Sequence, residues 1–369
     1  MAGAILEREL TAPKAGGVRF SVATKEDDAE IRRLSRENPM PGRISLSLER
    51  EPNFFAGANS SLETKNTIVA RDGRRVVCVG SCCVRQRFVN GKPRTVGYLG
   101  GLRLDARVAG RFDILRRGYD YFRQLQRDAP ADFYFTSIAA DNQRARTFLE
   151  RGLPGMPRYE FTCEFVTLVI PTLSCRQYQP SSLTIAPSDS RDGLPGFLNE
   201  CNSAYQFAPH LSPEDLPPSE FCVFRTGQQI EACGALWDQR QFKQIVVRGY
   251  SKLLATARPI FNIFSKLTHQ PRLPNIGEAL SIAFASCLAS KTDAPLVRLI
   301  QRLSNSARQR GIELLTLGFA ENDPRLANVR QNFRCREYRS RIYVVHWPGI
   351  GGTARELDNR VLAPEVALL

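Results

Sequence analysis

The stretch from Tyr98 to Arg127, YLGGLRLDARVAGRFDILRRGYDYFRQLQR, has the clearest structural pattern in the chain. Thr95 to Leu104 is rich in Val, Leu and Gly and predicts a β-strand. A short basic turn, Asp105 to Arg111, follows it. Apolar side chains then recur every three or four positions, which predicts an amphipathic helix: Phe112, Leu115, Tyr119, Phe122 and Leu125. We therefore expect a strand, a turn and a helix in direct succession.

The turn has the features of an anion site. Where a strand leads through a turn into a helix, free backbone N–H groups and the helix dipole are directed at one point, which suits a phosphate or pyrophosphate. Gly110 lets the backbone approach closely, and Arg103, Arg107 and Arg111 add positive charge. An ordinary strand-to-helix connection with solvated arginines fits the same spacing, so both interpretations stay open at this point.

Around this unit, the first half alternates strands and helices. Asp141 is predicted to cap a short helix that Gly152 ends, and Pro171 closes the last strand. The expected strands are Val18 to Ala23, Arg75 to Val84, Thr95 to Leu104, Phe133 to Ile138 and Tyr159 to Ile170, with a further helix starting in Lys25 to Glu30.

The second half repeats this order. Its helix with apolar residues from Leu296 to Ala307 ends at Gly311, and Asp323 and Pro324 form an N-cap and N1 pair for the next helix. The expected strands are Leu183 to Ala186, Glu231 to Trp237, Ile276 to Ala283, Ile312 to Leu317 and Arg341 to Trp347. We predict two tandem mixed α/β domains, at 18–171 and 182–348, joined by a linker at 172–181 and flanked by tails at 1–17 and 349–369.

The first half resembles the GNAT superfamily of acyl-CoA transferases. The family's pyrophosphate motif, Gln/Arg-x-x-Gly-x-Gly/Ala, is matched at its first four positions by Arg107-Val108-Ala109-Gly110, which Arg111 and Phe112 follow; Phe112 stands where the family has a small residue. Leu102-Arg103-Leu104-Asp105 looks like the family's splayed fourth strand, and Asn142 like the start of its next helix. The resemblance implies a coenzyme A site formed by Leu102, Arg103, Leu104, Arg107, Val108, Ala109, Gly110, Arg111, Phe112 and Asn142. Ser286 to Asp293, at the corresponding place in the second half, has no Arg-x-x-Gly, so that half looks like a degenerate copy.

The resemblance also implies acyl transfer from acetyl-CoA, or another acyl-CoA, to an amine. A backbone N–H near Leu104 would stabilise the oxyanion, and an acid would protonate the departing thiolate. Leu149 or Phe148 stands where the family often has a Tyr. The acid is therefore water, another residue or absent. Asp105 and Tyr98 are the nearby polar candidates for catalytic residues, although Asp105 in a turn is more often structural and Tyr98 can simply pack.

Charge and composition leave two rival functions. A GNAT-like protein that binds without catalysis would account for Phe112 and the missing Tyr. A nucleic-acid binder would account for the net charge of +14 and for arginines interleaved with aromatic residues: Arg325, Arg330, Arg334, Arg336, Arg339 and Arg341, with Phe333, Tyr338 and Tyr343. We favour the acyltransferase, expect no metal site, and expect a cytoplasmic location because no apolar run could span a membrane.

The insertion 240–274 allows two interpretations. It interleaves apolar and basic residues, which fits a basic amphipathic element on a membrane surface. It also fits extra helices packed on the second domain. We favour the packed helices, because Pro259 interrupts the segment and its apolar residues do not follow one clean face.

Overall fold

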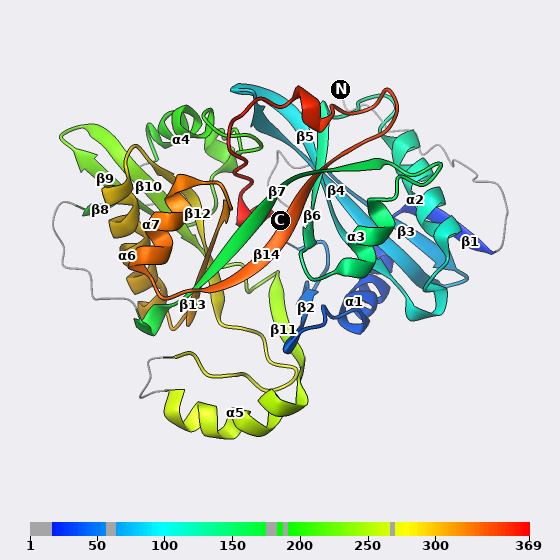
Figure 1. Ribbon diagram of the computed structural model, residues 1–369, viewed down its shortest axis with the longest axis horizontal. Helices are drawn as coiled ribbons and strands as arrows, with labels where there is room; N and C mark the ends of the chain where they lie inside the picture. The colour runs from blue at the N-terminus through cyan, green and yellow to red at the C-terminus, as the bar shows by residue number, and fades with distance from the viewer. Residues whose placement is uncertain (1–16, 57–63, 175–182, 187–190, 266–269) are drawn as a thin grey trace.

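The computed structural model describes residues 17–56, 64–174, 183–186, 191–265 and 270–369. One mixed sheet runs through these residues from end to end (Figure 1). Its strands, in spatial order, are β1 (Val18–Val22), β3 (Thr64–Asp72), β4 (Arg75–Val89), β5 (Lys92–Leu104), β6 (Phe133–Ala139), β14 (Arg336–His346), β7 (Arg158–Pro171), β13 (Leu314–Ala320), β12 (Ile282–Ser290), β10 (Gln229–Trp237), β9 (Phe221–Thr226) and β8 (Leu183–Ala186).

Helices cover both faces of this sheet and bury its apolar side chains. In the first half, α2 (Phe112–Leu125) and α3 (Gln143–Leu149) pack on one face, and α1 (Asp28–Glu37) packs on β3 and β4. In the second half, α6 (Asp293–Gln309) and α7 (Pro324–Asn332) share one core, and α4 (Leu194–Asn202) belongs to another. The mixed α/β fold predicted from the sequence is confirmed.

The two halves exchange their last strands. β7, the last strand of the first half, pairs with β13 of the second half from Leu314↔Pro171 to Ala320↔Phe165. β14, the last strand of the second half, pairs with β6 of the first half from Ser340↔Ala139 to Val344↔Phe135. The two exchanged strands also pair with each other at the centre. The predicted boundaries at 171 and 182 stay a prediction, but hydrogen bonding does not stop at them.

Each half contains a fork in the sheet. The parallel strands β5 and β6 pair only at Val96↔Phe133, Gly97↔Tyr134 and Tyr98↔Phe135, and then diverge. β12 and β13 likewise share three pairs, from Ile282↔Leu314 to Phe284↔Thr316. Beyond each fork, the first strand bulges against its antiparallel neighbour. The bulge residues have positive φ: +66° at Gly101 and +52° at Cys287.

Four expectations from the sequence need correction. The strand predicted at Ile276 to Ala283 is wrong, because β12 begins only at Ile282. The residues before it, up to Leu280, form backbone hydrogen bonds with the segment around Val246, outside the main sheet. Asn142, not Asp141, caps α3, since its side-chain oxygen accepts the Ala145 N–H at 3.1 Å. The segment 349–369 packs into the core with Leu362 and Ala367 buried, rather than forming a loose tail.

The fourth correction concerns the insertion 240–274. It forms a strand, β11 (Gln244–Tyr250), and one helix, α5 (Lys252–Ser265), in place of several packed helices. β11 pairs with β2 (Ile44–Glu49) of the first half in a two-stranded sheet. The Arg248 guanidinium forms an ion pair with the buried Glu49 carboxylate across this sheet, so the insertion links the two halves.

Candidate functional site

The predicted anion turn connects β5 to α2 and is held by Asp105. After β5 ends at Leu104, residues Ala106–Val108 form a 3-10 turn whose N-cap is Asp105. The Asp105 carboxylate accepts the backbone N–H of Arg107 at 3.0 Å, and the Arg111 N–H donates to the Val108 carbonyl at 3.0 Å. The backbone of the turn is therefore fixed by its own sequence.

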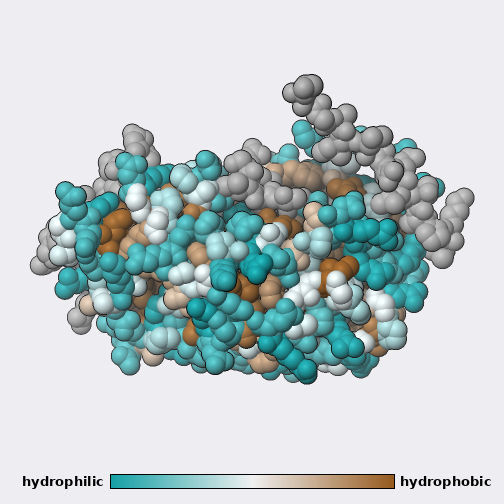
Figure 2. Space-filling view, turned by 90° about the horizontal axis from the view of Figure 1, so that it is seen from above, coloured by the Kyte–Doolittle hydropathy of each residue, from teal (hydrophilic) through white to brown (hydrophobic). Residues whose placement is uncertain are grey.

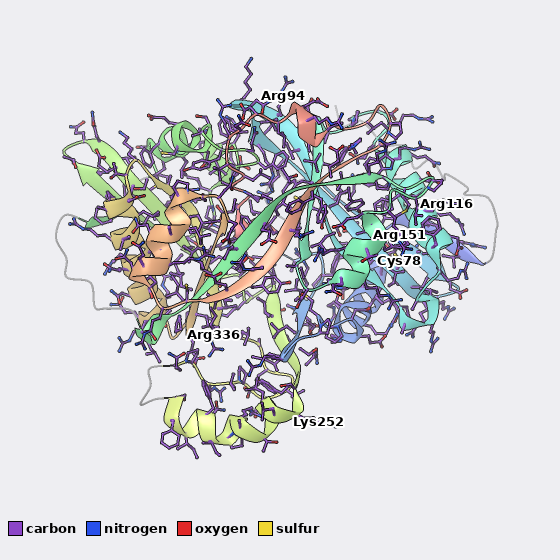
Figure 3. The ribbon with its side chains drawn as sticks, in the orientation of Figure 1. Cys78, Arg94, Arg116, Arg151, Lys252 and Arg336 are labelled. Atoms are coloured by element: carbon purple, nitrogen blue, oxygen red, sulfur yellow. The ribbon has the colours of Figure 1, made fainter. Side chains whose placement is uncertain are left out.

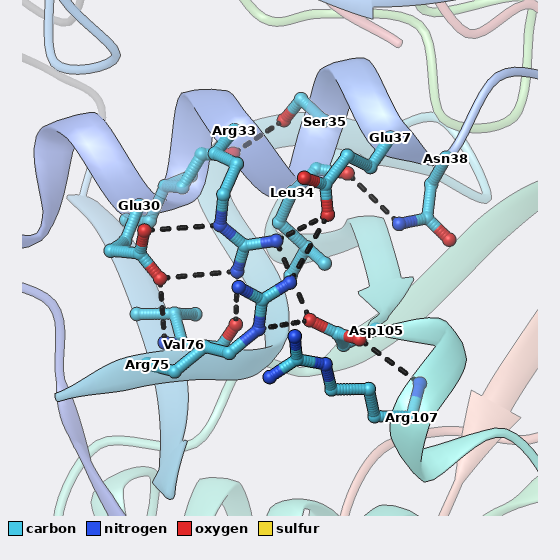
Figure 4. A network of polar contacts seen from close by, with 11 residues as sticks. Glu30, Arg33, Leu34, Ser35, Glu37, Asn38, Arg75, Val76, Asp105 and Arg107 are labelled. Atoms are coloured by element: carbon cyan, nitrogen blue, oxygen red, sulfur yellow. Dashed lines mark hydrogen bonds and ion pairs between the residues drawn. The ribbon is translucent and has the colours of Figure 1, made fainter. Parts of the chain in front are cut away.

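Asp105 also anchors the turn to the rest of the first half (Figure 4). Its carboxylate, 3% exposed, lies 2.7 Å from Arg75 Nε and 3.4 Å from Arg33 Nη1. Burial on its own would raise the pKa of Asp105, but the Arg107 amide and the Arg75 guanidinium outweigh it and lower the pKa. An acid that stays ionised and has all these partners is suited to holding the turn rather than to giving up a proton.

Gly110 leaves an opening at the start of α2. It has a φ of +90°, and a Cβ placed there would meet no atom within 4 Å. Arg111, at the N-cap of α2, makes no side-chain capping bond. The first N–H groups of that helix have no carbonyl partner within the helix, and they follow directly after the open turn at Gly110. Arg111 lies on the same turn but forks onto Asp113 at 2.7 and 2.8 Å, which neutralises part of its charge.

The side chain of Phe112 points away from this opening. Its ring packs edge-on against Phe148 of α3, with the two centroids 5.6 Å apart, and it contacts the core under α2 and α3. The position that departs from the GNAT motif therefore contributes to packing between two helices. A large residue here leaves the approach to the N-terminus of α2 free.

A surface hollow lies next to this contact. Its volume is about 420 Å³, and it is lined on α3 and just beyond by Gln143, Arg144, Thr147, Phe148 and Arg151. Arg107, Arg144 and Arg151 are exposed and make no ion pair with any other described residue. Figure 3 shows Arg116, another exposed arginine, on the same side of the molecule as Arg151. Positive charge without internal partners thus surrounds the turn and the hollow.

Tyr98 lies at the apex of the fork between β5 and β6. It is the last β5 residue paired with β6, and one step further the Thr136 hydroxyl donates to the Leu99 carbonyl at 2.6 Å. Burial raises the pKa of Tyr98 to about 12, although nearby Arg87 and Arg103 act to lower it. Tyr98 therefore keeps its proton at neutral pH, in contrast to Asp105. The structure separates the two candidate catalytic residues, one at the apex of the fork and one below the turn.

Tyr338 is a residue near the fork that the sequence did not single out as a site residue. It lies on β14, and the exchange of last strands brings it within electrostatic range of Tyr98 and of Arg103 on β5. Burial raises the pKa of Tyr338 to about 12 and lowers the pKa of Arg103. Because Tyr338 belongs to the second half in sequence, only knowledge of the strand exchange could have assigned it to this fork.

The fork of the second half is closed. β12 reaches Ser290 and α6 begins at Asp293, so the connection is only Lys291 and Thr292. The segment that ends the chain lies on this fork, and Glu365 Oε2 accepts the N–H of the bulge residue Cys287 at 3.0 Å. Burial raises the pKa of the Glu365 carboxyl group, although the Cys287 amide acts to lower it. This half therefore offers neither the turn nor an empty fork.

The arginine cluster that indicated a nucleic-acid interface is largely paired with carboxylates. Arg325 pairs with Asp323 at 2.7 Å, and Arg330 with Glu337 at 2.7 Å. Arg339 and Arg341 pair with acids from the first half, including Glu164 at 3.1 and 3.9 Å. The sequence showed Glu337 as the only acid within the cluster, but folding brings Glu150, Glu164 and Glu321 beside it. This pairing removes most of the charge that would have bound phosphates.

The fold is similar to those of solved N-myristoyltransferase and GCN5-related N-acetyltransferase structures. The fold aligns with Saccharomyces cerevisiae N-myristoyltransferase with bound myristoyl-CoA at a TM-score of 0.61 and 10% identity, covering 96% of this chain and 91% of that chain. A structure of the same yeast enzyme with myristoyl-CoA and inhibitors gives 0.62 and 11%, covering 97% and 88%. A GCN5-related N-acetyltransferase from Sphaerobacter thermophilus gives 0.52 and 11%, covering 89% and 96%.

No protein-family model and no curated protein sequence matches the chain. At identities of 10–11%, the likeness shows the fold alone. A shared fold does not by itself assign an activity, an acyl group or an acceptor. Among the described helices, none is both long and apolar enough to cross a membrane.

Proposed function

We propose that the protein is an acyl-CoA-dependent N-acyltransferase whose single cofactor site lies in the first half. The observation that carries the proposal is the open turn at Gly110, where unpartnered helix N–H groups meet exposed arginines beside a fork in the sheet. This combination would accept a pyrophosphate next to a thioester. Acetyl-CoA as the donor and a cytoplasmic location remain predictions.

The proposed path of the cofactor follows the open surfaces in order. The pyrophosphate would lie against Arg107–Phe112, with the adenosine and its 3′-phosphate towards the hollow that Arg144 and Arg151 line. Leu102, Arg103 and Leu104 form the diverging edge of the fork, along which the pantetheine arm would lie. Asn142 caps α3 at the edge of the hollow and so contributes through the position of that helix.

The chemistry is the transfer of an acyl group from sulfur to nitrogen. An ammonium acceptor first loses a proton to solvent, and the resulting neutral amine attacks the thioester carbon. The C–N bond forms, the C–S bond breaks, the thiolate leaves, and the acylated nitrogen gives its extra proton to solvent. Of the two candidates, Tyr98 is the one that could donate a proton to that thiolate and then regain one from solvent, because it is protonated at neutral pH and lies at the apex of the fork. Asp105 remains the second candidate, but its ion pairs favour a role in holding the turn.

A thermal-shift series tests cofactor binding and measures the acyl preference. Free CoA, acetyl-CoA and acyl-CoAs of increasing chain length should each raise the melting temperature, because they bind only the native state. The chain length with the largest shift identifies the donor class. If neither CoA nor any acyl-CoA shifts the transition, the proposed function is wrong; shifts without turnover of amine acceptors would favour the non-catalytic binding protein.

A matched pair of variants locates the site. Gly110→Asp adds a negative side chain where the pyrophosphate would approach and should abolish the CoA shift. Gly227→Asp makes the same change at another glycine with positive φ (+62°) and no atom within 4 Å of its added Cβ, in the second half. Both variants add the same charge at an open glycine with positive φ, so equal CoA binding by both would refute the assignment of the turn.

A further inference from the structure

The helix of the insertion presents an apolar face to solvent. We define the α5 surface as Leu253, Ile260, Ile263 and Phe264 of α5 together with Ile276 beside it, whose exposed fractions are 77%, 62%, 71%, 53% and 63%. The four helical positions recur at three, four and seven residues and so form one stripe. Large apolar side chains at this exposure and spacing are typical of a surface that binds something.

The opposite face of α5 attaches to the protein mainly through polar contacts. Asn262 Nδ2 donates to the Leu273 carbonyl at 2.9 Å, and the Leu273 N–H donates back to Asn262 Oδ1 at 2.8 Å. Arg258 Nε donates to the same carbonyl at 3.1 Å. These bonds fix which face of the helix is turned inward. The apolar stripe is therefore held facing outward and is not part of a core.

The charge on α5 itself has one sign. Residues 249–277 contain Lys252, Arg258, Lys266 and Arg272 and no Asp or Glu, and the acid that follows, Glu278, forms an ion pair with Arg272 at 3.2 Å. Lys252 stands exposed at the start of α5 (Figure 3) and forms no ion pair within the described residues. An apolar stripe with an exposed cation at its end is complementary to a surface that is apolar inside and negative outside.

The position of α5 also favours a broad partner. The helix projects from the body of the molecule below β2 and β11 (Figure 1). The face on the other side of the molecule is mostly hydrophilic, with its apolar residues in small separate patches (Figure 2). A projecting helix can enter a lipid interface from one side, whereas a protein partner would need a matching groove.

We propose that the α5 surface docks the protein on an anionic lipid surface, with α5 lying in the interface. The apolar stripe would enter the boundary between headgroups and acyl chains, and Lys252 would face anionic headgroups. This proposal stands on the insertion alone and does not depend on the acyl-transfer site. It reverses the preference that the sequence gave for packed helices.

Flotation with lipid vesicles tests the proposal on the full chain. Wild-type protein should float with vesicles containing 30% phosphatidylglycerol in phosphatidylcholine, and binding to pure phosphatidylcholine should be at least about tenfold weaker. Added salt should weaken binding to the anionic vesicles, because surface charges are screened. Equal binding to both vesicle types, or no binding to either, would overturn the proposal.

Two variants assign the binding to α5. Ile260→Ser/Phe264→Ser should lower vesicle affinity at least about tenfold, since each side chain loses its apolar contact. Phe161→Ser, at a phenylalanine of β7 that is 48% exposed, is the matched control and should bind as wild type. Both proteins should keep the wild-type melting temperature within a few degrees, as the replaced side chains are exposed. If instead the double variant floats normally, or changes a dimer into a monomer without affecting flotation, the α5 surface has another occupant.

Discussion

The connections β5–α2 and β12–α6 occupy the same place in the two halves and have opposite properties. The first runs from Asp105 to Arg111, contains a 3-10 turn, and leaves the N-terminus of α2 open beside Gly110. The second consists of Lys291 and Thr292, which is too short to form such a turn before α6 begins. Both follow a bulged strand at a three-pair fork. Both halves therefore have the fork, but only the first has the additional turn residues that the proposed anion site requires.

The two forks also differ in what fills them. At the second fork, Glu365 bonds the N–H of the bulge residue Cys287 and has a raised pKa. In the first half, Asp105 lies below the turn and has a lowered pKa. The Glu365 carboxyl group therefore closes a fork in surroundings that disfavour its ionised form. The Asp105 carboxylate supports an open turn in surroundings that favour its ionised form.

The sharpest test of this asymmetry is the number of cofactors bound. Calorimetry should find one CoA per chain, and Gly110→Asp should lower the affinity at least about 100-fold, because two charge-assisted hydrogen bonds are worth that much. Thr292→Asp places the same charge at the N-cap of α6 in the second half and should leave the affinity within about twofold. Two CoA molecules per chain, or a large loss with Thr292→Asp, would show that the second half also binds.

Asp105→Asn should cost about 2–3 kcal/mol of folding stability at pH 7, because it leaves Arg33 and Arg75 without their buried partner. The lowered pKa means that Asp105 stabilises the fold above its unfolded value near 4 and loses this contribution as the pH falls through the folded value. Urea denaturation of both proteins between pH 7 and pH 3 should therefore show the difference shrinking towards acid. A difference that is constant with pH would mean that the charge of Asp105 is not the cause.

Phe112→Ala tests whether the departure from the family motif obstructs the site. The ring is only partly buried, so its removal should cost about 2 kcal/mol, less than the ~3–5 kcal/mol of a fully buried Phe, and CoA affinity should not improve. Thermal denaturation and calorimetry measure the two effects. A variant that loses no stability and binds CoA more tightly would show that Phe112 blocks the turn in the natural protein.

Glu365→Gln should have the opposite pH dependence to Asp105→Asn. Because burial raises the pKa of Glu365, the wild-type protein loses stability as the pH rises from about 4 through the folded value, and the neutral variant does not. The amide oxygen of Gln can still accept the Cys287 N–H. The variant should therefore gain stability relative to wild type from pH 4 to pH 7 in urea denaturation. The opposite trend would place the Glu365 charge in a favourable environment.

The smallest expected effect concerns the hollow beside α3. Arg151→Ser should weaken CoA binding about threefold, since one exposed cation is lost, and should leave dephospho-CoA binding unchanged. Arg336→Ser, at an exposed arginine of β14 away from the hollow, is the control and should change neither affinity. An equal loss of affinity for CoA and dephospho-CoA would show that the 3′-phosphate does not bind at the hollow.

The sequence predicted local features well and long-range ones poorly. The strand, turn and helix at residues 95–125 follow from hydrophobic spacing and are confirmed, as is the cap of α7 by Asp323. The fork could be anticipated only through the family resemblance. The place of Tyr338 beside the fork and the acids that neutralise the arginine cluster were missed, because their neighbours are distant in sequence and come together through strand exchange. The insertion was misjudged because its apolar residues, taken together, do not follow one face, whereas those exposed on α5 alone form one stripe.

The exchange of β7 and β14 has a consequence for synthesis of the protein. The first half lacks the neighbour of β6 until β14 has emerged from the ribosome, about 175 residues after β7 ends. At about 5–20 residues per second, β6 and β7 spend roughly 10–35 s without the strand that later lies between them. Two open edges of this kind invite pairing with other chains. The protein therefore reaches its native sheet only after β14 has been synthesised, and a nascent chain that stalls before β14 leaves the first half unfinished.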